Sequence, residues 1–280
     1  MNYNDRLAAR IKAVGSVLCV GIDPDTTAIP TAFLAGRTMA EGVLNYCSAL
    51  INATAPYAAA FKINFAFFEA LGDPGLSVLR QVRMAVPADI PTIADAKRGD
   101  IGNTAKRYAA AIFEQMAFDA VTLNAFMGRD TIDPFWSYRD RGVYVLVRTS
   151  NPSATEVQEF GPPGNPLSHQ MARWLAQWVS QGGTAGATGM VVGATTGSEL
   201  GYLAEAHPSL GLLIPGLGTQ GGRVEDVRAL LRVQRAPLLA NVSRGISQLD
   251  DPGVDPSLGW KTRAAYWSSQ LSTRLDRAST

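Results

Sequence analysis

Eight short apolar runs, each followed by a longer segment with helical spacing, constrain the fold of this 280-residue chain more than any other feature. The runs are apolar on both faces, as the strands of a parallel sheet covered by helices must be. Eight units in this length give about 35 residues for each strand and its helix, the size of one step in a (β/α)8 barrel. We therefore predict an α/β fold, a (β/α)8 TIM barrel formed by residues 1–280 as a single domain. The predicted strands are residues 16–22, 58–64, 91–97, 120–124, 143–149, 189–194, 211–215 and 237–243.

An open, doubly wound parallel sheet is the alternative fold. Its dinucleotide-binding form carries G-x-G-x-x-G directly after the first strand, whereas this chain has GIDPDTT at residues 21–27. No internal repeat and no Gly/Ser-rich linker divides the chain. The closed barrel is therefore the better prediction.

Composition excludes several classes of protein. The chain has 25 Lys+Arg and 24 Asp+Glu, a net charge of +1, so no overall field would attract nucleic acid or an anionic membrane. Cys19 and Cys47 are the only cysteines, too few for a disulfide framework, which favours a reducing compartment. The N-terminus is polar, and no apolar run reaches about eighteen residues, the length of a spanning helix. We expect a cytoplasmic protein with neither nucleic-acid nor membrane partners.

Two long loops are predicted at the carboxyl-terminal face of the barrel, where the active sites of this fold lie. Residues 23–37 follow the first predicted strand, and residues 151–168 follow the fifth. Loops of this length are usually functional or disordered. We predict that the segment at about 151–168 is a lid over the site.

Charged residues at the ends of the predicted strands are the candidates for chemistry. Only five lysines occur in the chain, and two of them, Lys62 and Lys97, lie at strand ends. Asp95 and Lys97 are two residues apart on one strand, so both side chains should point into the barrel mouth, and Asp100 follows in the loop. Two carboxylates beside a lysine favour its charged form, which suits a proton donor and opposes a Schiff base. A structural ion-pair network is the alternative interpretation of the D-x-K-x-x-D spacing.

A phosphate site is predicted on the same face. Residues 216–222 (GLGTQGG) follow the seventh strand, and Arg244 follows the eighth. Glycines let backbone N–H groups approach an anion, and the loops after strands seven and eight of barrels commonly bind phosphate. Arg244 supplies a forked cationic donor, which favours the phosphate site over a ligand-free tight turn.

The two histidines predict no metal site. His169 and His207 have no acidic or cysteine partners at metal-ligand spacing in the sequence. We therefore expect capping or surface roles for both.

The chain resembles the orotidine 5′-phosphate decarboxylase family in its motifs and in their order along the sequence. The most specific motif is ADAKRGDIGNT at residues 94–104, which is similar to the family's variant signature DAKRGDIG around the catalytic lysine. The resemblance implies a (β/α)8 barrel, a homodimer with active sites shared across the interface, and cofactor-free decarboxylation of orotidine 5′-monophosphate to UMP. The other similar motifs are GIDP at 21–24, FKIN at 61–64, RTSNPS at 148–153, PGLGTQGG at 215–222 and NVSRGI at 241–246.

The resemblance also implies roles for the matching residues. Lys97 would donate the proton to C6, and Asp95 would lie near the substrate carboxylate. Asp100, Ile101 and Thr104 would reach into the neighbouring subunit's site. The implied substrate-binding residues divide by the part of the nucleotide that they contact: Asp23, Lys62 and Asn64 at the ribose, Ser150 at the pyrimidine, and Gln220, Gly221 and Arg244 at the phosphate.

Two alternative functions use the same residues. The first is a magnesium-dependent sugar-phosphate decarboxylase or aldolase of the same barrel superfamily, in which a similar D-x-K-x-x-D places a carboxylate on the metal. The second is a non-catalytic nucleotide-binding barrel, which would keep Arg244 and the glycine loop but has no need of the Asp-Lys-Asp set. A chelator test separates the first alternative from a cofactor-free enzyme.

Overall fold

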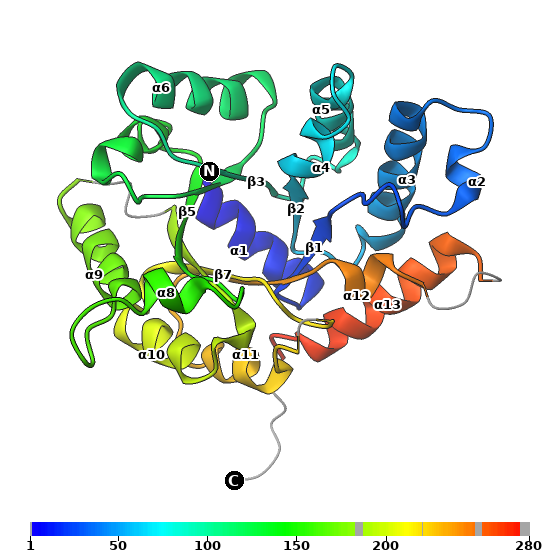
Figure 1. Cartoon of the computed structure of the whole chain (residues 1–280). Coiled ribbons are helices and arrows are strands. Elements are labelled where there is room, and N and C mark those ends of the chain that lie inside the picture. Colours follow the sequence, from blue (N-terminus) through cyan, green and yellow to red (C-terminus); the bar gives the residue numbers. More distant parts are fainter. Residues whose placement is uncertain (1, 183–186, 220, 250–253, 275–280) are drawn as a thin grey trace, which may run out of the picture.

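The computed structural model contains eight parallel strands that close into a barrel, each pairing with the next along the chain and the last with the first (Figure 1). The structure describes residues 2–182, 187–219, 221–249 and 254–274. The strands are β1 Leu18–Ile22, β2 Ala60–Asn64, β3 Thr92–Arg98, β4 Ala120–Leu123, β5 Gly142–Arg148, β6 Thr188–Val192, β7 Gly211–Ile214 and β8 Leu238–Val242. Each of the eight predicted runs overlaps one of these strands, and three of the strands, β3, β5 and β6, extend one residue beyond the predicted bounds, so the predicted (β/α)8 barrel is confirmed.

Helices connect the strands and cover the outside of the barrel. They are α1 Tyr3–Val14, α2 Thr31–Leu34, α3 Met39–Thr54, α4 Phe65–Glu69, α5 Gly75–Ala85, α6 Gly102–Ala110, α7 Asp133–Trp136, α8 Ala154–Gln158, α9 Leu167–Ser180, α10 Ser198–Ala206, α11 Val224–Leu230, α12 Arg244–Ser247 and α13 Pro256–Gln270. Figure 1 looks along the barrel and shows α3, α5, α6, α9, α10, α11 and α13 in the surrounding ring. None of the helices in the described ranges is long and apolar enough to cross a membrane.

Helix α1 closes the amino-terminal end of the barrel. Tyr3 Oη lies 3.2 Å from Tyr144 Oη of β5, and Arg10 donates a hydrogen bond to the backbone oxygen of Ala58, just before β2. In Figure 1 α1 crosses the middle of the ring of helices. One buried apolar cluster fills this end, and its members include Tyr3, Leu7, Cys19, Ala60, Ile93, Ala120, Tyr144, Val191, Leu213 and Leu239.

The next inward-facing layer, toward the carboxyl ends of the strands, contains buried polar side chains on half of the strands. Side chains of a strand alternate between its two faces, so a residue two positions after a member of the apolar cluster points into the barrel again. Applied to the eight strand residues of that cluster, this rule selects eight positions, and four of them carry buried side chains that can hydrogen-bond, Lys62, Asp95, Thr122 and Asn241. The other four are Gly21, Leu146, Gly193 and Pro215.

Both predicted loop segments contain a short helix. Residues 23–37 include α2, and residues 151–168 include α8 and the start of α9 at Leu167. The lid function of the second segment stays a prediction.

A buried carboxylate ties strands together at the amino-terminal end. Asp119, just before β4, accepts hydrogen bonds from the backbone N–H of Thr92 (2.9 Å), from the hydroxyl of Thr92 (2.8 Å) and from Arg6 (2.6 Å). Arg83 and Arg141 place guanidinium nitrogens 3.6 and 3.5 Å from its oxygens. The Asp119 side chain is 3% exposed, so three arginines share one desolvated anion.

We expect Asp119→Ala to lower the free energy of unfolding by about 3–5 kcal/mol, because it leaves three arginines facing one another without their counter-ion. Urea unfolding would measure the change. Asp140→Ala is the matched control, since the Asp140 side chain is 67% exposed and its loss should cost at most about 0.5 kcal/mol. A loss below about 1 kcal/mol for Asp119→Ala would contradict the role of this carboxylate.

Candidate active site

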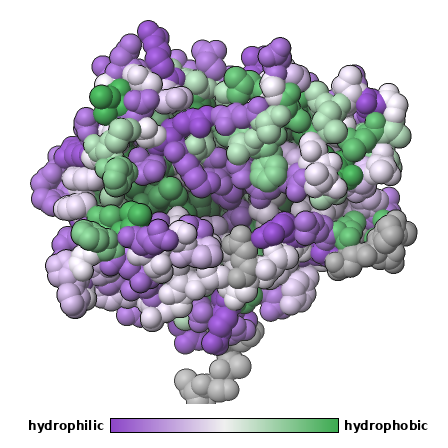
Figure 2. All heavy atoms as spheres, viewed as in Figure 1, coloured by the Kyte–Doolittle hydropathy of each residue, from purple (hydrophilic) through white to green (hydrophobic). Residues whose placement is uncertain are grey.

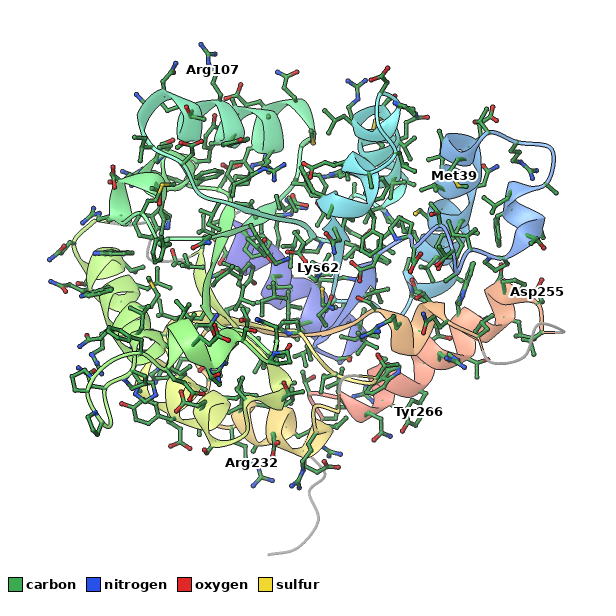
Figure 3. The ribbon with its side chains drawn as sticks, viewed as in Figure 1. Met39, Lys62, Arg107, Arg232, Asp255 and Tyr266 are labelled. Atoms are coloured by element: carbon green, nitrogen blue, oxygen red, sulfur yellow. The ribbon has the colours of Figure 1, made fainter. Side chains whose placement is uncertain are left out.

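One carboxylate, Asp95, holds two lysines at the ends of β2 and β3. Lys62 Nζ lies 2.5 Å from Asp95 Oδ2, and Lys97 Nζ lies 2.6 Å from Asp95 Oδ1. The hydroxyl of Thr122 on β4 donates to the same Oδ1 at 3.0 Å. The sequence led us to expect Lys97 between two carboxylates, but within one chain the order is reversed, and a carboxylate lies between two ammonium groups. Figure 3 shows Lys62 in the middle of the ring of helices.

Lys97 reaches Asp95 through an irregular backbone rather than through simple strand alternation. Its φ is +46°, a left-handed conformation that is uncommon for a residue with a side chain, and the β3–β4 register shifts between Ala94 and Arg98. The Lys97 N–H donates to Thr122 Oγ1 at 3.0 Å, which supports this conformation. The Lys97 side chain is 50% exposed, whereas Lys62 is 5% exposed. The irregularity therefore presents the Lys97 ammonium group to the barrel mouth. Strain of this kind is typical of functional sites.

The pKa shifts of the buried pair keep both groups charged. Burial alone would raise the pKa of Asp95, but the Lys62 and Lys97 ammonium groups outweigh it and hold that pKa well below its ordinary value. Burial alone would lower the pKa of Lys62, but the carboxylates of Asp95 and Asp23 outweigh it and raise that pKa above its ordinary value. The charges of this pair therefore persist over the physiological pH range.

A pocket of about 150 Å³, which Lys62 lines, lies at the carboxyl ends of β1, β2, β7 and β8. A second pocket of about 330 Å³ shares Asp23, Asn64 and Arg244 with it. Asp23 Oδ1 is buried and has no hydrogen-bond partner among the described residues, and Asn64 accepts from the N–H of Ala66 at the start of α4. Figure 2 shows hydrophilic residues gathered near the middle of this view. The first pocket is lined by Asp23, Lys62, Asn64, Pro215, Gly216, Leu217, Thr219, Asn241, Ser243 and Arg244.

The glycine-rich loop after β7 has the backbone that a tight anion-binding turn requires. Gly216, Gly218 and Gly221 have φ values of +98°, +81° and +86°, which favour glycine. The N–H of Gly221 donates to the backbone oxygen of Gly218 at 3.0 Å, so in this conformation Gly221 shapes the turn. Arg244 begins α12 and lines both pockets, on the same face as this loop. Gln220, predicted to contact the phosphate, lies outside the described residues.

Asp100, Ile101 and Thr104 are not brought to the Lys97 of their own chain. Asp100 Oδ1 accepts from the N–H of Ile101 at 2.8 Å, Ile101 is 56% exposed, and Thr104 is exposed on α6. Ile101 and Thr104 are thus exposed and Asp100 is half-buried, and within the described ranges none of the three forms a hydrogen bond or ion pair with Lys97.

Ser150 follows β5 on a loop that α8 holds in place. Gln158 of α8 accepts from the backbone N–H of Thr149 and donates to the Thr149 hydroxyl, both at 2.8 Å. Arg148 and Glu159 add an ion pair of 2.6 Å. Gly193 makes room beside Ser150, because a Cβ at that glycine would lie 3.0 Å from the Ser150 Cβ. The segment after β5 is thus fastened to the strand directly beside the predicted pyrimidine-binding residue.

Sequence reasoning missed three polar residues of the site, Thr122, Gln158 and Asn241. Thr122 and Asn241 each interrupt an apolar strand, a signal that could have identified them. Gln158 gave no such signal, because its role depends on contacts across a loop.

The surface role expected for His169 was wrong. His169 is 8% exposed, lies 2.9 Å from a carboxylate oxygen of Glu199 and stacks on Tyr202. These residues belong to α9 and α10, away from the lysines. In the described part of the chain, no group of three or more His, Cys, Asp or Glu residues is placed to hold a metal ion.

Comparisons with known proteins identify relatives along nearly the whole chain. A family model described as "Orotidine 5′-phosphate decarboxylase / HUMPS family" matches residues 16–255. Orotidine 5′-phosphate decarboxylase of Thermomicrobium roseum is 41% identical over 253 residues, which cover 89% of this chain and 88% of that protein. The Herpetosiphon aurantiacus protein of the same name is 40% identical over 237 residues, 82% of this chain and 84% of that protein. Among solved structures, Leishmania donovani OMP decarboxylase has a TM-score of 0.79 at 34% identity, with 97% of this chain and 98% of that chain covered.

We expect the stability of Asp95→Asn to depend on pH in a way that the wild-type pair does not. In the wild type the raised pKa of Lys62 and the lowered pKa of Asp95 make their contribution constant between about pH 5 and 9. Without Asp95, burial and the neighbouring ammonium group depress the pKa of Lys62, so the folded state releases its proton first and stability rises with pH. The deficit relative to wild type should be about 3–5 kcal/mol near pH 6 and smaller near pH 9.5.

Urea unfolding at several pH values measures this deficit. Asp140→Asn, at an exposed aspartate, is the control and should show no pH-dependent difference from wild type. A deficit for Asp95→Asn that is equal at both pH values would show that Lys62 does not depend on Asp95 for its charge.

Proposed function

The chain belongs to the orotidine 5′-phosphate decarboxylase / HUMPS family, and we propose that it converts orotidine 5′-monophosphate to UMP and CO₂ without a cofactor. The observation that carries this proposal is the Lys62–Asp95–Lys97 cluster beside a pocket lined by Arg244. A cationic cluster can stabilise a carbanion, and an arginine beside a glycine loop can bind a phosphate. The two features lie on one face of the barrel, as a substrate with a reacting ring and a remote phosphate requires.

The residues of the pockets and the adjacent loops suggest which part of the nucleotide each would bind. Arg244 and the loop at 216–222 would bind the phosphate, with Gln220 as a further donor. Asp23 and Lys62 would bind the ribose, since Asp23 Oδ1 is a buried acceptor without a partner among the described residues. Asn64 lines both pockets beside them, and Ser150 would contact the pyrimidine from the end of β5.

The proposed mechanism depends on charge at C6. The C6–carboxylate bond breaks, its electron pair stays on C6, and no adjacent carbonyl accepts that charge. Lys97 stabilises the carbanion electrostatically and then donates an Nζ proton to C6, after which solvent reprotonates the amine. Asp95 beside the substrate carboxylate would disfavour the bound ground state more than the transition state, in which that charge has moved. The phosphate is remote from C6, so its binding energy can align the ring and close the segment at 151–168.

We propose that the active enzyme is a homodimer with shared sites. Ile101 and Thr104 are exposed, and Ile101 and Phe126 are 56% and 77% exposed. The loops that carry them are adjacent, because the N–H of Asn124 donates to the oxygen of Arg98 at 2.8 Å. Apolar side chains exposed on adjacent loops favour contact with a second copy. Asp100 would then complete the site of the partner subunit.

We also propose a cytoplasmic location. Cys19 and Cys47 are both free and buried, as is common for cysteines of proteins from reducing compartments.

The first test is the loss of orotidine 5′-monophosphate absorbance with EDTA present. We expect full activity of the wild type, and we expect Lys97→Ala to lose several orders of magnitude in kcat while it still binds UMP, because the proton donor is gone. Lys12→Ala, on α1 at the opposite end of the barrel, is the matched control and should keep wild-type kcat.

Three results would contradict the mechanism. Inhibition by EDTA would indicate the magnesium-dependent alternative. More than about a tenth of wild-type kcat in Lys97→Ala, a change in barrier of only about 1.4 kcal/mol, would remove Lys97 from the central role. A borohydride-stable adduct on Lys97 would indicate a Schiff-base mechanism.

A second test mixes two inactive variants, Lys97→Ala and Asp100→Ala. If the sites are shared, each mixed dimer has one site with both defects and one intact site. Random pairing makes about half of the dimers mixed, so activity should recover to roughly a quarter of wild type. Mixing Lys97→Ala with Lys62→Ala is the control, since both residues belong to the same site and no intact site can form. No recovery in the first mixture after verified subunit exchange would refute the shared site.

A further inference from the structure

We infer that Asn241 is a further substrate-binding residue, and that its side-chain oxygen accepts a hydrogen bond from the 3′-hydroxyl of the ribose. This inference rests on the proposed function. It adds a specificity-determining contact that the motifs do not assign, in the pocket that Lys62 and Arg244 also line.

Asn241 is a buried amide whose oxygen has no hydrogen-bond partner in the part of the chain that the structure describes. It is 6% exposed, in a strand whose other residues are buried and apolar. Its Nδ2 donates to Ser243 Oγ at 3.3 Å, which orients the amide. Its Oδ1 is buried and has no hydrogen-bond partner among the described residues. A buried acceptor without a donor is costly, so the donor is expected to come from a ligand.

The position of Asn241 directs this oxygen toward the pocket. Asn241 pairs with Cys19 in the β1–β8 register, two residues before Gly21. A Cβ at Gly21 would lie 1.8 Å from Ser243 Oγ and 3.2 Å from Asn241 Oδ1, so glycine keeps this space open. Lys62 pairs with Gly21 on the other side, and both Lys62 and Asn241 line the 150 Å³ pocket. Asn241 therefore belongs to the same inward layer as the reacting cluster.

The pocket determines which substrate group fits. An acceptor needs a hydroxyl or N–H, which excludes the phosphate dianion, and the pyrimidine N–H is assigned to Ser150 after β5, on a different side of the barrel. The ribose hydroxyls remain. The pocket also contains Gly216, Thr219 and Arg244 of the proposed phosphate site. The 3′-carbon adjoins the carbon that bears the phosphate arm, whereas the 2′-carbon adjoins the carbon that bears the base, so the 3′-hydroxyl is nearer to Asn241. Asp23 Oδ1 and the Lys62 ammonium group lie in the same pocket to complete its contacts.

The test compares the dissociation constants of UMP, 2′-deoxy-UMP and 3′-deoxy-UMP for wild type and Asn241→Leu, a change that keeps size and removes the acceptor. We expect Asn241→Leu to weaken UMP and 2′-deoxy-UMP by about threefold to tenfold, the effect of one neutral hydrogen bond, and to leave 3′-deoxy-UMP within about twofold of wild type. Asn241→Asp, which keeps an acceptor oxygen at this position, should retain the preference for UMP over 3′-deoxy-UMP. Gln234→Leu is the matched control, since Gln234 also has a buried amide oxygen with no partner in the described ranges but lies before β8, at the amino-terminal end.

The outcomes separate this inference from the proposed function. Equal weakening of all three ligands by Asn241→Leu would show a structural effect and overturn the inference. Weakening of UMP and 3′-deoxy-UMP but not of 2′-deoxy-UMP would assign the contact to the 2′-hydroxyl and would also overturn it. A wild type that decarboxylates orotidine 5′-monophosphate while Asn241→Leu binds all three ligands normally would overturn the inference alone. A wild type that neither decarboxylates orotidine 5′-monophosphate nor binds UMP would overturn the proposed function, and this inference with it.

Discussion

The contact on which the site depends is the buried carboxylate of Asp95 between two lysines. An ammonium group as buried as that of Lys62 is unfavourable without a counter-ion, and Asp95 supplies one at 2.5 Å. The same carboxylate fixes Lys97 at 2.6 Å and accepts a hydrogen bond from Thr122. Three adjacent strands are thereby tied together at their carboxyl ends. The left-handed backbone of Lys97 is tolerated because these contacts, and the bond from its N–H to Thr122, define its position.

The two ends of the barrel differ in composition and in role: one end is packed and apolar, and the other carries the candidate site. At the amino-terminal end, α1 and the apolar cluster close the interior, and Asp119 with its arginines supports the strand ends. At the carboxyl-terminal end, four inward positions carry buried polar side chains, and the glycine-rich loop and Arg244 line a pocket. Buried polar groups are costly unless they are paired, so a barrel can carry them only where partners or a ligand satisfy them. The division agrees with the general rule that barrels place stability at one end and chemistry at the other.

The sequence predicted the barrel and much of the candidate site because these depend on local patterns. Each strand is an apolar run, and Asp95 and Lys97 are neighbours in one strand. The pairing of Lys62 with Asp95 was not predicted, since it joins residues 33 positions apart and depends on the β2–β3 register. The left-handed backbone conformation of Lys97 has no sequence signal, because it is imposed by contacts with the neighbouring strand and not by the residue type. The burial of His169 against Glu199 of another helix likewise depends on packing between distant segments.

Charge explains why the cluster suits a substrate that loses a carboxylate. Lys62, Asp95 and Lys97 together carry one positive charge within a single chain, and the pKa shifts of Asp95 and Lys62 preserve that charge on both sides of neutrality. A substrate carboxylate brings one negative charge to this site. In the proposed mechanism, the same charge moves to C6 beside the Lys97 ammonium group when CO₂ leaves, so the net charge of the site is unchanged during bond breaking. The protein then needs little reorganisation in the transition state, because its fixed charges already match the product of the step. A single neutral lysine could not meet this requirement, and a lysine without Asp95 could not be held charged beside a second one. The buried carboxylate of Asp95 thus allows two lysine ammonium groups to lie side by side at the place where the proposed carbanion forms.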